Sequence, residues 1–399
     1  MEFYNAKKSL LEKVKILGSE SVPVGISFGR ILAEDFHSIK NTPEFERSPL
    51  DGYCFNYEDT AVASKDNPVY FDVIEEIPCG EVATKKINKF ECYKILTGAK
   101  IPSAANCVIK YEDVEIVDNK IKLCRSLNKN ENVIMIGEDV KEGTLLAKKG
   151  QVIDTGVVGT AVSQGIKEFL VYKKIKVGFI STGSELVEID ENIIDGKIYN
   201  SNRYIFKTIL NKQGIDIEYY GIVEDSIEKM KKVFEKAHNE CDIIISTGGV
   251  SVGDYDLVER ALNELGFNIF VNGIEMKPGM ACCFGAKNGK IVLGLSGNPM
   301  SSVTTFYAVC LPAIKKMMGN NDFENKYFKV KLKNSFSKKI KGLRFLRGVY
   351  EIENGRAVVN LNSDQGNIVI KSFIGCNAMV KVENVDEVKE GMEMDCMII

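Results

Sequence analysis

Three short segments rich in glycine and hydroxyl side chains carry the residue types best suited to bind an anion. They are residues 181–185 (STGSE), residues 246–256 (STGGVSVGDYD) and residues 295–301 (LSGNPMS). Glycine lets the backbone approach a ligand closely, and the last segment leads into a predicted helix whose first N–H groups would face an anion. One such segment alone is typical of a tight turn with a helix cap, whereas three together predict a site for phosphates or another oxyanion.

Acidic residues beside these glycines predict a cation as well. Glu185, Asp254 and Asp256 would repel a bound anion unless a hard cation lay between them, and carboxylate oxygens are ligands that Mg²⁺ prefers. The known phosphate fingerprints are absent from the sequence, which contains no G-x-x-x-x-G-K-S/T and no G-x-G-x-x-G after the first strand of this region. Neither a P-loop nor a Rossmann-type NAD site is therefore predicted.

Two further segments are open to two interpretations. Residues 48–53 (SPLDGY) and residues 277–279 (KPG) are both typical turn sequences. The functional interpretation of the first is that Asp51 presents a carboxylate to a neighbouring domain or subunit. That of the second is that Lys277 turns a cation toward the same anion site.

The composition narrows the chemistry further. With 52 Lys and Arg against 55 Asp and Glu, the formal net charge of −3 removes the main electrostatic argument for nucleic-acid binding. The 11 cysteines form no C-x-x-C pair, and His37 and His238 are the only histidines, so zinc ribbons, iron–sulfur clusters and His-based triads are not predicted. No apolar run approaches a membrane span, and residues 1–11 lack a signal-peptide core. A cytoplasmic protein with reduced thiols is expected.

The elements that would position the glycine-rich segments alternate between strands and helices. Strands are predicted over residues 175–183, 216–223, 242–247 and 291–295, and helices from about residues 200, 226, 256 and 300. Such alternation predicts a doubly wound α/β domain, in which ligands bind at the carboxyl ends of the strands. Because all three segments follow predicted strands directly, the anion site is expected at this edge of the sheet.

Two other regions have the pattern of β structure. Residues 43–139 contain short β-rich runs between predicted helices at 4–17 and 154–165, which predicts an insertion between two parts of one domain. From residue 326 onward the pattern is again β, with a hairpin turn at residues 353–355 (ENG), and predicts a separate small β domain or barrel. For 399 residues, about two to four domains are expected.

With these segments in place, the sequence resembles the MoeA-type molybdopterin molybdenumtransferases, a family that also supplies one domain of gephyrin and of plant insertases. The matching motifs run along nearly the whole chain: SPLDGY (48–53), ILTGAKIPSAANCVIKYED (95–113), GEDVKEG (137–143), STGSEL (181–186), YNSNRY (199–204), STGGVSVGDYD (246–256), MKPG (276–279), SGNPMS (296–301), RFLRG (344–348) and DQG (364–366). Each motif alone is weak, but their joint occurrence in this order is specific.

The resemblance implies four domains. They would cover residues 1–45 together with 140–172, residues 46–139, residues 173–325 and residues 326–399. The fold class is then a doubly wound α/β molybdopterin-binding domain combined with a β-rich inserted domain and a small C-terminal β barrel. The resemblance also implies an elongated homodimer, whose active site lies between the α/β domain of one subunit and the insertion of the other. Asp51 and Thr97 would reach across the dimer.

The implied reaction belongs to molybdenum cofactor biosynthesis. Adenylylated molybdopterin and molybdate are the implied substrates and Mg²⁺ the cofactor, while AMP is released and molybdenum is placed on the dithiolene sulfurs. An adenylyltransferase that supplies the adenylylated pterin would be a partner, and neither nucleic acid nor a membrane would take part. Charge neutralisation and positioning would be the main catalytic effects.

The family's functional residues carry over at the positions that match its motifs. The implied catalytic residues are Asp51, Thr97, Glu185, Asp256 and Lys277, of which Asp51, Glu185 and Asp256 would bind the metal. The implied ligand-binding residues are Ser181, Thr182, Gly183, Thr247, Gly248, Gly249, Ser251, Gly253, Asp254, Pro278, Gly297, Asn298, Pro299, Ser301, Arg347 and Ser372.

The sequence also departs from the family pattern. Met280 stands where a second lysine follows K-P-G, Ser296 replaces the proline of L-P-G-N-P, and Ser184 replaces the aspartate of S-T-G-D-E-L. In the R-x-x-F-x-R pattern Arg347 matches, and the first arginine is absent unless Arg344 substitutes for it. Three alternatives to an active insertase therefore stand: a weak or tungstate-selective paralogue, a pterin-binding scaffold, and a nucleotide hydrolase with a related α/β domain.

Overall fold

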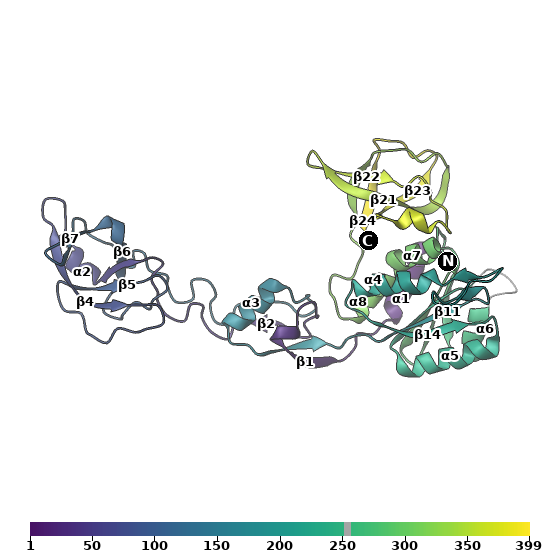
Figure 1. Ribbon diagram of the computed structural model, residues 1–399, viewed down its shortest axis with the longest axis horizontal. Coiled ribbons are helices and arrows are strands. Elements are labelled where there is room, and N and C mark those ends of the chain that lie inside the picture. The colour runs from purple at the N-terminus through teal and green to yellow at the C-terminus, as the bar shows by residue number, and fades with distance from the viewer. Residues whose placement is uncertain (251–256) are drawn as a thin grey trace.

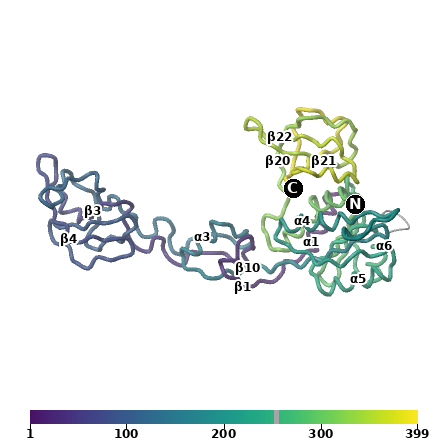
Figure 2. Tube along the Cα trace, in the orientation of Figure 1, coloured from purple at the N-terminus to yellow at the C-terminus, as the bar shows by residue number. Residues whose placement is uncertain are grey.

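The computed structural model describes residues 1–250 and 257–399. The molecule is elongated, with a β-rich distal unit at one end, a small middle unit, and an α/β body carrying a β barrel at the other end (Figure 1). The trace in Figure 2 leaves the body, runs out through the middle unit to the distal unit and returns, so the distal unit is an insertion. Within the described ranges, no helix combines the length and the apolar character that a bilayer crossing needs. The boundaries of the four expected domains stay predictions.

The α/β body is built on a six-stranded sheet in the order β14-β11-β15-β19-β18-β16. Its strands are β11 (Val177–Thr182), β14 (Ile217–Val223), β15 (Ile243–Thr247), β16 (Asn268–Asn272), β18 (Cys282–Lys287) and β19 (Lys290–Leu295). The first four strands of that order are parallel, while β18 runs antiparallel to both of its neighbours. Every residue of β11 and β15 is buried, as expected for strands that are covered on both faces.

Helices cover both faces of this sheet and confirm the predicted doubly wound fold. They are α1 (Phe3–Lys13), α4 (Ser201–Asn211), α5 (Ile227–Glu240), α6 (Leu257–Glu264), α7 (Pro299–Thr305) and α8 (Leu311–Met317). On one face, α5 and α6 bury Met230, Phe234 and Leu262 against the sheet. On the other face, α1, α4, α7 and α8 share a larger core. A π-helical turn (Phe306–Cys310) joins α7 to α8, so the helix predicted from residue 300 is interrupted.

The middle unit combines segments from both sides of the insertion. Its elements are β1 (Ser19–Pro23), β2 (Phe36–His37), β9 (Leu145–Ala147), α3 (Thr155–Ser163) and β10 (Glu168–Tyr172). β1 pairs with β10 and β2 with β9. Asp154 is the N-cap of helix α3, because its Oδ1 accepts a hydrogen bond from Val157 N at 2.9 Å. Helix α1 does not join this unit, because Phe3, Ala6 and Leu10 are buried in the core of the body.

The distal unit is a second six-stranded sheet, in the order β6-β3-β5-β4-β8-β7. Its elements are β3 (Gly52–Phe55), α2 (Tyr57–Thr60), β4 (Val69–Ile77), β5 (Glu91–Ile95), β6 (Cys107–Lys110), β7 (Glu115–Val117) and β8 (Lys120–Leu123). Asp51 directly precedes β3 and Thr97 follows β5. Because β3 and β5 are antiparallel and pair Gly52 with Ile95, these two residues lie at the same edge of the sheet.

The C-terminal unit is a closed barrel. Its strands are β20 (Phe328–Leu332), β21 (Ile340–Glu353), β22 (Arg356–Leu361), β23 (Ala378–Val385) and β24 (Glu393–Ile398). β21 pairs with both β22 and β23 and so closes the ring. The predicted hairpin turn between β21 and β22 is confirmed, with Asn354 and Gly355 at φ values of 49° and 74°. A short strand of the body, β17 (Met276–Lys277), adds to β21 in parallel and pairs Lys277 with Arg344.

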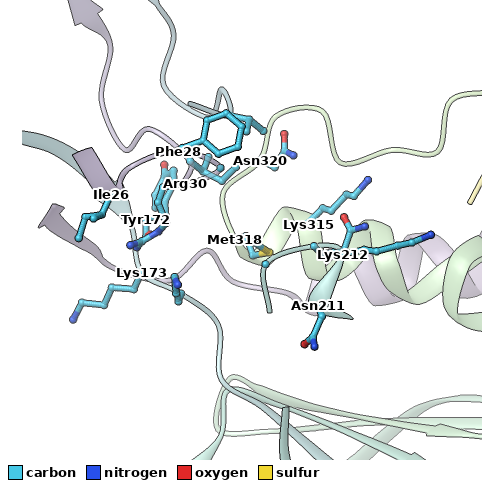
Figure 3. A pocket seen from close by; sticks show the side chains of 16 residues that line it. Ile26, Phe28, Arg30, Tyr172, Lys173, Asn211, Lys212, Lys315, Met318 and Asn320 are labelled. Atoms are coloured by element: carbon cyan, nitrogen blue, oxygen red, sulfur yellow. The ribbon is translucent and has the colours of Figure 1, made fainter. Parts of the chain in front are cut away.

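The middle unit meets the body at a narrow junction. Tyr172, at the end of β10, lies against Gly319, where an added Cβ would come within 2.2 Å of the tyrosine ring. A crevice of about 510 Å³ opens beside this contact. Figure 3 shows Phe28 and Tyr172 on the side of the middle unit, and Lys212 and Lys315 on the side of the body. This contact joins the middle unit to the body.

Candidate active site

A cavity of about 870 Å³ opens at the carboxyl edge of the sheet in the α/β body. The segments after β11, β15 and β19 meet there because these strands are parallel, with Ser181 paired to Thr247 and Thr247 paired to Leu295. The predicted residues that line the cavity are Thr182, Gly183, Glu185, Thr247, Gly248, Gly249, Gly297, Asn298 and Pro299. The structure therefore brings residues of all three glycine-rich segments to one site.

At the cavity, the backbone at Gly248 passes very close to the backbone at Thr182. Gly248 has a φ of 97°, and a Cβ at this position would lie 2.2 Å from the carbonyl oxygen of Thr182, so only glycine fits. Two polar atoms of lining residues, Thr247 Oγ1 and Asn202 Oδ1, are buried and have no hydrogen-bond partner in the described part of the chain. Buried polar atoms are rarely left unpaired, so these two favour a polar ligand or ordered water.

Several lining residues were not predicted from the sequence. Asp225 follows β14, and Ile368 and Ile370 reach the cavity from the barrel. Ser184 N donates to Asp225 Oδ2 at 3.1 Å, and Asp225 N donates to Ser184 Oγ at 3.2 Å. Ser184 therefore holds a second carboxylate at the cavity that already contains Glu185. The rule that ligands bind at the carboxyl ends of parallel strands would have pointed to Asp225, whereas no local signal pointed to the two isoleucines.

A partly buried polar network supports the end of β11. Asn200 Nδ2 donates to Ser181 Oγ at 2.9 Å, and Glu188 accepts from Tyr219 OH at 2.5 Å and from Arg203 Nη1 at 2.7 Å. Burial alone would raise the pKa of Glu188, but the hydrogen bonds from Tyr219, Arg203 and Asn200 leave it lowered. Ser181 is thus buried in this network and supports the loop behind the cavity without lining it.

Arg347 lies in β21 with its side chain wholly buried. Its Nε donates to Ser372 Oγ at 3.0 Å and its Nη2 to Gly366 O at 3.0 Å, while Nη1 is buried without a partner in the described residues. Burial lowers the pKa of Arg347, although arginine stays charged in proteins. A buried cation with an unused donor, beside a serine hydroxyl, fits an oxyanion.

Lys277 and Ser301 approach this region from the body. The Lys277–Pro278 peptide bond is cis, and Gly279 O accepts a hydrogen bond from Thr305 Oγ1 of α7 at 3.1 Å. Ser301 lies in the first turn of the same helix and is buried. The turn that carries Lys277 and Pro278 is thereby fastened to α7, with the lysine exposed.

The first turn of α7 also contacts the barrel. Met300 N donates to Asn367 O at 3.0 Å, one residue after Gly366, whose carbonyl oxygen accepts from Arg347. The barrel segment that accepts a hydrogen bond from Arg347 thus also contacts the start of α7. The same segment carries both Ser372 and the two isoleucines that line the cavity.

Asp51 and Thr97 form a compact pair on the distal unit. Asp51 Oδ1 accepts hydrogen bonds from Thr97 N at 2.7 Å and Thr97 Oγ1 at 2.8 Å, and these bonds lower the pKa of Asp51. Within one chain the distal unit lies at the opposite end of the molecule from the cavity (Figure 1). The structure therefore does not bring this pair to the other predicted site residues. The predicted residues Ser251, Gly253, Asp254 and Asp256 lie outside the described ranges.

A doubly wound α/β body with a cavity at its sheet edge, an inserted arm and a closed barrel make up a multidomain ligand-binding architecture. Residues 1–165 match the MoeA N-terminal region (domain I and II), residues 178–316 a probable molybdopterin binding domain, and residues 329–399 the MoeA C-terminal region (domain IV). The chain belongs to the MoeA family of molybdopterin molybdenumtransferases, and its family is one of transferases.

Individual relatives agree with this family. The molybdopterin molybdenumtransferase of Staphylococcus epidermidis is 34% identical over 355 residues, covering 89% of this chain and 84% of that protein. The enzyme of the same name from Staphylococcus aureus is 32% identical over 354 residues, with the same coverage of 89% and 84%. A solved structure of the molybdopterin biosynthesis MoeA protein from Pyrococcus horikoshii OT3 superposes with a TM-score of 0.85 at 30% identity and covers 100% of both chains.

Proposed function

We propose that this chain inserts molybdenum from molybdate into adenylylated molybdopterin, with Mg²⁺-dependent release of AMP. The observation that carries the proposal is the buried, partly unpaired guanidinium of Arg347 beside Ser372, on the barrel segment whose Ile368 and Ile370 line the cavity at the sheet edge. The family supplies the reaction class, and these two neighbouring sites supply a place for each substrate.

The cavity is the proposed site of the pterin nucleotide. Its volume of about 870 Å³ lies within the usual range for sites that enclose small ligands, about 300–1,000 Å³. Gly248, Gly249 and Gly297 let phosphate oxygens approach the backbone, while Ile368 and Ile370 give an apolar surface for a planar ring. Both parts of an adenylylated pterin therefore find suitable partners in it.

Molybdate is proposed to bind at Arg347. The unused Nη1 would donate to one oxygen, Ser301 would offer a hydroxyl group, and Lys277 would add charge from the exposed side. Ser372, whose hydroxyl donates to Val369 O at 2.6 Å and accepts from Arg347 Nε, would orient the guanidinium. Here the chain's residues bind and orient the oxyanion next to the pterin. Replacing Lys277 by alanine should raise the molybdate requirement more than it weakens pterin binding, and the opposite pattern would place Lys277 on the phosphates.

The carboxylates at the cavity fit a hard cation. Glu185 and Asp225 both line it, and carboxylate oxygens are the preferred ligands of Mg²⁺. Glu185 together with Asp51 of a second subunit would hold the ion, and Asp256, outside the described ranges, stays the third predicted ligand. When bound, Mg²⁺ would offset the negative charge of the phosphates. The lowered pKa of Asp51 keeps its carboxylate ionised and ready for this role.

A homodimer is proposed because the site is incomplete in one chain. Asp51 and Thr97 stand at the end of the arm, far from the cavity of their own chain (Figure 1). A second copy would place this pair at the cavity of its partner. An adenylyltransferase would deliver the pterin nucleotide, and the cytoplasm is the proposed location because all eleven cysteines are free thiols.

The test is reconstitution with purified protein, adenylylated molybdopterin, Mg²⁺ and either molybdate or tungstate. Release of AMP coupled to formation of metal-bound pterin is expected, and the preferred oxyanion shows whether Met280 and Ser296 alter the site. Tight pterin binding without AMP release under either oxyanion would refute the insertase and favour a scaffold. Release of AMP without any need for an oxyanion would favour a hydrolase.

A further inference from the structure

Arg344 is a half-buried cation that the proposed reaction does not use. It lies three residues before Arg347 in β21, but the two side chains face opposite sides of the strand: Phe345 packs in the core shared with the body, whereas Leu346 packs inside the barrel. Arg344 follows the same alternation as Leu346 and therefore points toward the barrel. The strand thus presents one arginine to each side.

Arg344 has no charged partner in the described residues. Its Nε is buried without a hydrogen-bond acceptor in the described residues, and the centroid of the Phe336 ring lies 5.1 Å from its guanidinium carbon. Desolvation lowers its pKa. A guanidinium that has lost its water on one edge and has no hydrogen-bond acceptor there destabilises the fold, unless a bound anion provides the acceptor.

A polar pocket of about 420 Å³ lies in front of this side chain, at the mouth of the barrel. Lys338, Ser337 and Asn362 line it together with Arg344. Lys338 is exposed and also lacks an ion-pair partner in the described part of the chain. The one acid in the lining, Asp364, accepts a hydrogen bond from Gly366 N at 2.9 Å and forms no ion pair with either cation.

We propose that this pocket is a second oxyanion-binding site, which holds a tetrahedral dianion such as molybdate next to the Arg347 site. The planar fork of an arginine matches two oxygens of such an ion, and the surrounding hydroxyl and amide groups match the others. The assignment to molybdate rests on the proposed function, whereas the anion site itself rests on the unpaired cations.

The two oxyanion sites share one wall. Asp364 and Gly366 line the pocket of Arg344, and their carbonyl oxygens accept hydrogen bonds from Arg347 Nη2 on the other side, at 3.4 and 3.0 Å. Arg344 is also paired in register with Lys277. An ion held at the barrel mouth would therefore lie across this segment from Arg347. The site would raise the local molybdate concentration in a chain that has a neutral Met280 where the family has a lysine.

Equilibrium dialysis of the full-length protein with radiolabelled molybdate tests the proposal. Parallel dialyses with excess sulfate or phosphate show whether the pocket is selective among dianions. The variants are Arg344→Met, which keeps the apolar stem, Arg347→Met, and both together. The matched control is Arg356→Met, which removes an exposed arginine of the same barrel at the start of β22. Far-ultraviolet circular dichroism and thermal unfolding check that each variant is folded.

The parent and the control are expected to bind two molybdate ions per chain, each single variant one, and the double variant none. A single ion in the parent, or two ions in Arg344→Met, would overturn the proposal. If Arg347→Met alone keeps both ions, the proposed role of Arg347 fails while the barrel-mouth site stands. If Arg344→Met does not fold, Lys338→Met decides: at least threefold weaker binding of one of the two ions supports the site, and unchanged binding overturns it.

Discussion

Replacing Arg347 by methionine should have a small effect on the free energy of unfolding and a large effect on molybdate binding. The guanidinium is wholly buried and donates hydrogen bonds to Ser372 and Gly366. A hydrogen bond of a charged group contributes about 1.5–3 kcal/mol, so the loss of these two bonds at 3.0 Å costs about 3–6 kcal/mol, and the longer bond to Asp364 O at 3.4 Å adds less. Removing the buried charge recovers a desolvation penalty of several kcal/mol. We therefore expect the free energy of unfolding to change by less than about 3 kcal/mol.

Oxyanion binding should respond very differently to the same change. The unpaired Nη1 of Arg347 is proposed to donate at least one charge-assisted hydrogen bond to molybdate. Losing about 1.5–3 kcal/mol of binding free energy weakens molybdate binding about 10- to 150-fold. Pterin binding should change little, because Arg347 does not line the cavity.

Two measurements check this prediction on the same preparation. Thermal unfolding gives the change in stability, and the molybdate dependence of AMP release gives the change in KM for molybdate, with Arg356→Met as the control. A folded Arg347→Met protein whose KM for molybdate stays within twofold of the parent value would refute the reasoning. Arg347 would then be a structural cation that fixes the segment from Asp364 to Ser372.

Three other substitutions test separate parts of the argument. Asp51→Asn should abolish AMP release without shifting the thermal unfolding temperature. In the parent protein, the pH–rate profile should show no inflection from Asp51 above pH 3.8, because the pKa of Asp51 is lowered from that value. Glu188→Gln should lower the free energy of unfolding by about 1–3 kcal/mol at neutral pH. Because the pKa of Glu188 is lowered from 4.5, its contribution is present above that pH and lost as the pH falls through the lowered value, so acid unfolding of parent and variant should converge. Gly319→Ala should lower stability by about 1–3 kcal/mol, because its φ is 82° and the new Cβ would clash with Tyr172, whereas Gly25→Ala, with open space around it, should not.

The ligand-binding edge of the sheet could be predicted from the sequence, because the strands and the segments that follow them are determined by local sequence patterns. Continuous apolar runs indicate strands covered on both faces, and parallel strands place their carboxyl ends together. The predicted strand at 216–223 is observed as Ile217–Val223, and the helix predicted from residue 256 as Leu257–Glu264.

The remaining features depend on contacts between distant segments. The apolar spacing of residues 4–17 predicts a helix, which is observed at residues 3–13. The spacing does not predict that α1 packs on the body, because it defines an apolar face of the helix but not the element that covers this face. The burial of Arg347 depends on the segment around Gly366 folding over it. Likewise, Ile368 and Ile370 reach the cavity only because the barrel sits on the first turn of α7.

The separation of charged groups in the fold agrees with the proposed homodimer. The body and barrel hold the groups that attract anions, namely Arg347 and Lys277, next to Glu185 and Asp225 at the cavity. A further carboxylate fixed in the same rigid body would repel phosphate and molybdate before any Mg²⁺ arrived. In the proposed homodimer, Asp51 on the arm would reach the site only when a second chain docks, so its charge would be added together with the Mg²⁺ that it is proposed to bind. The hydrogen bonds from Thr97 favour the ionised form of the Asp51 carboxylate. This carboxylate lies on the arm, at the opposite end of the molecule from the cavity of its own chain (Figure 1).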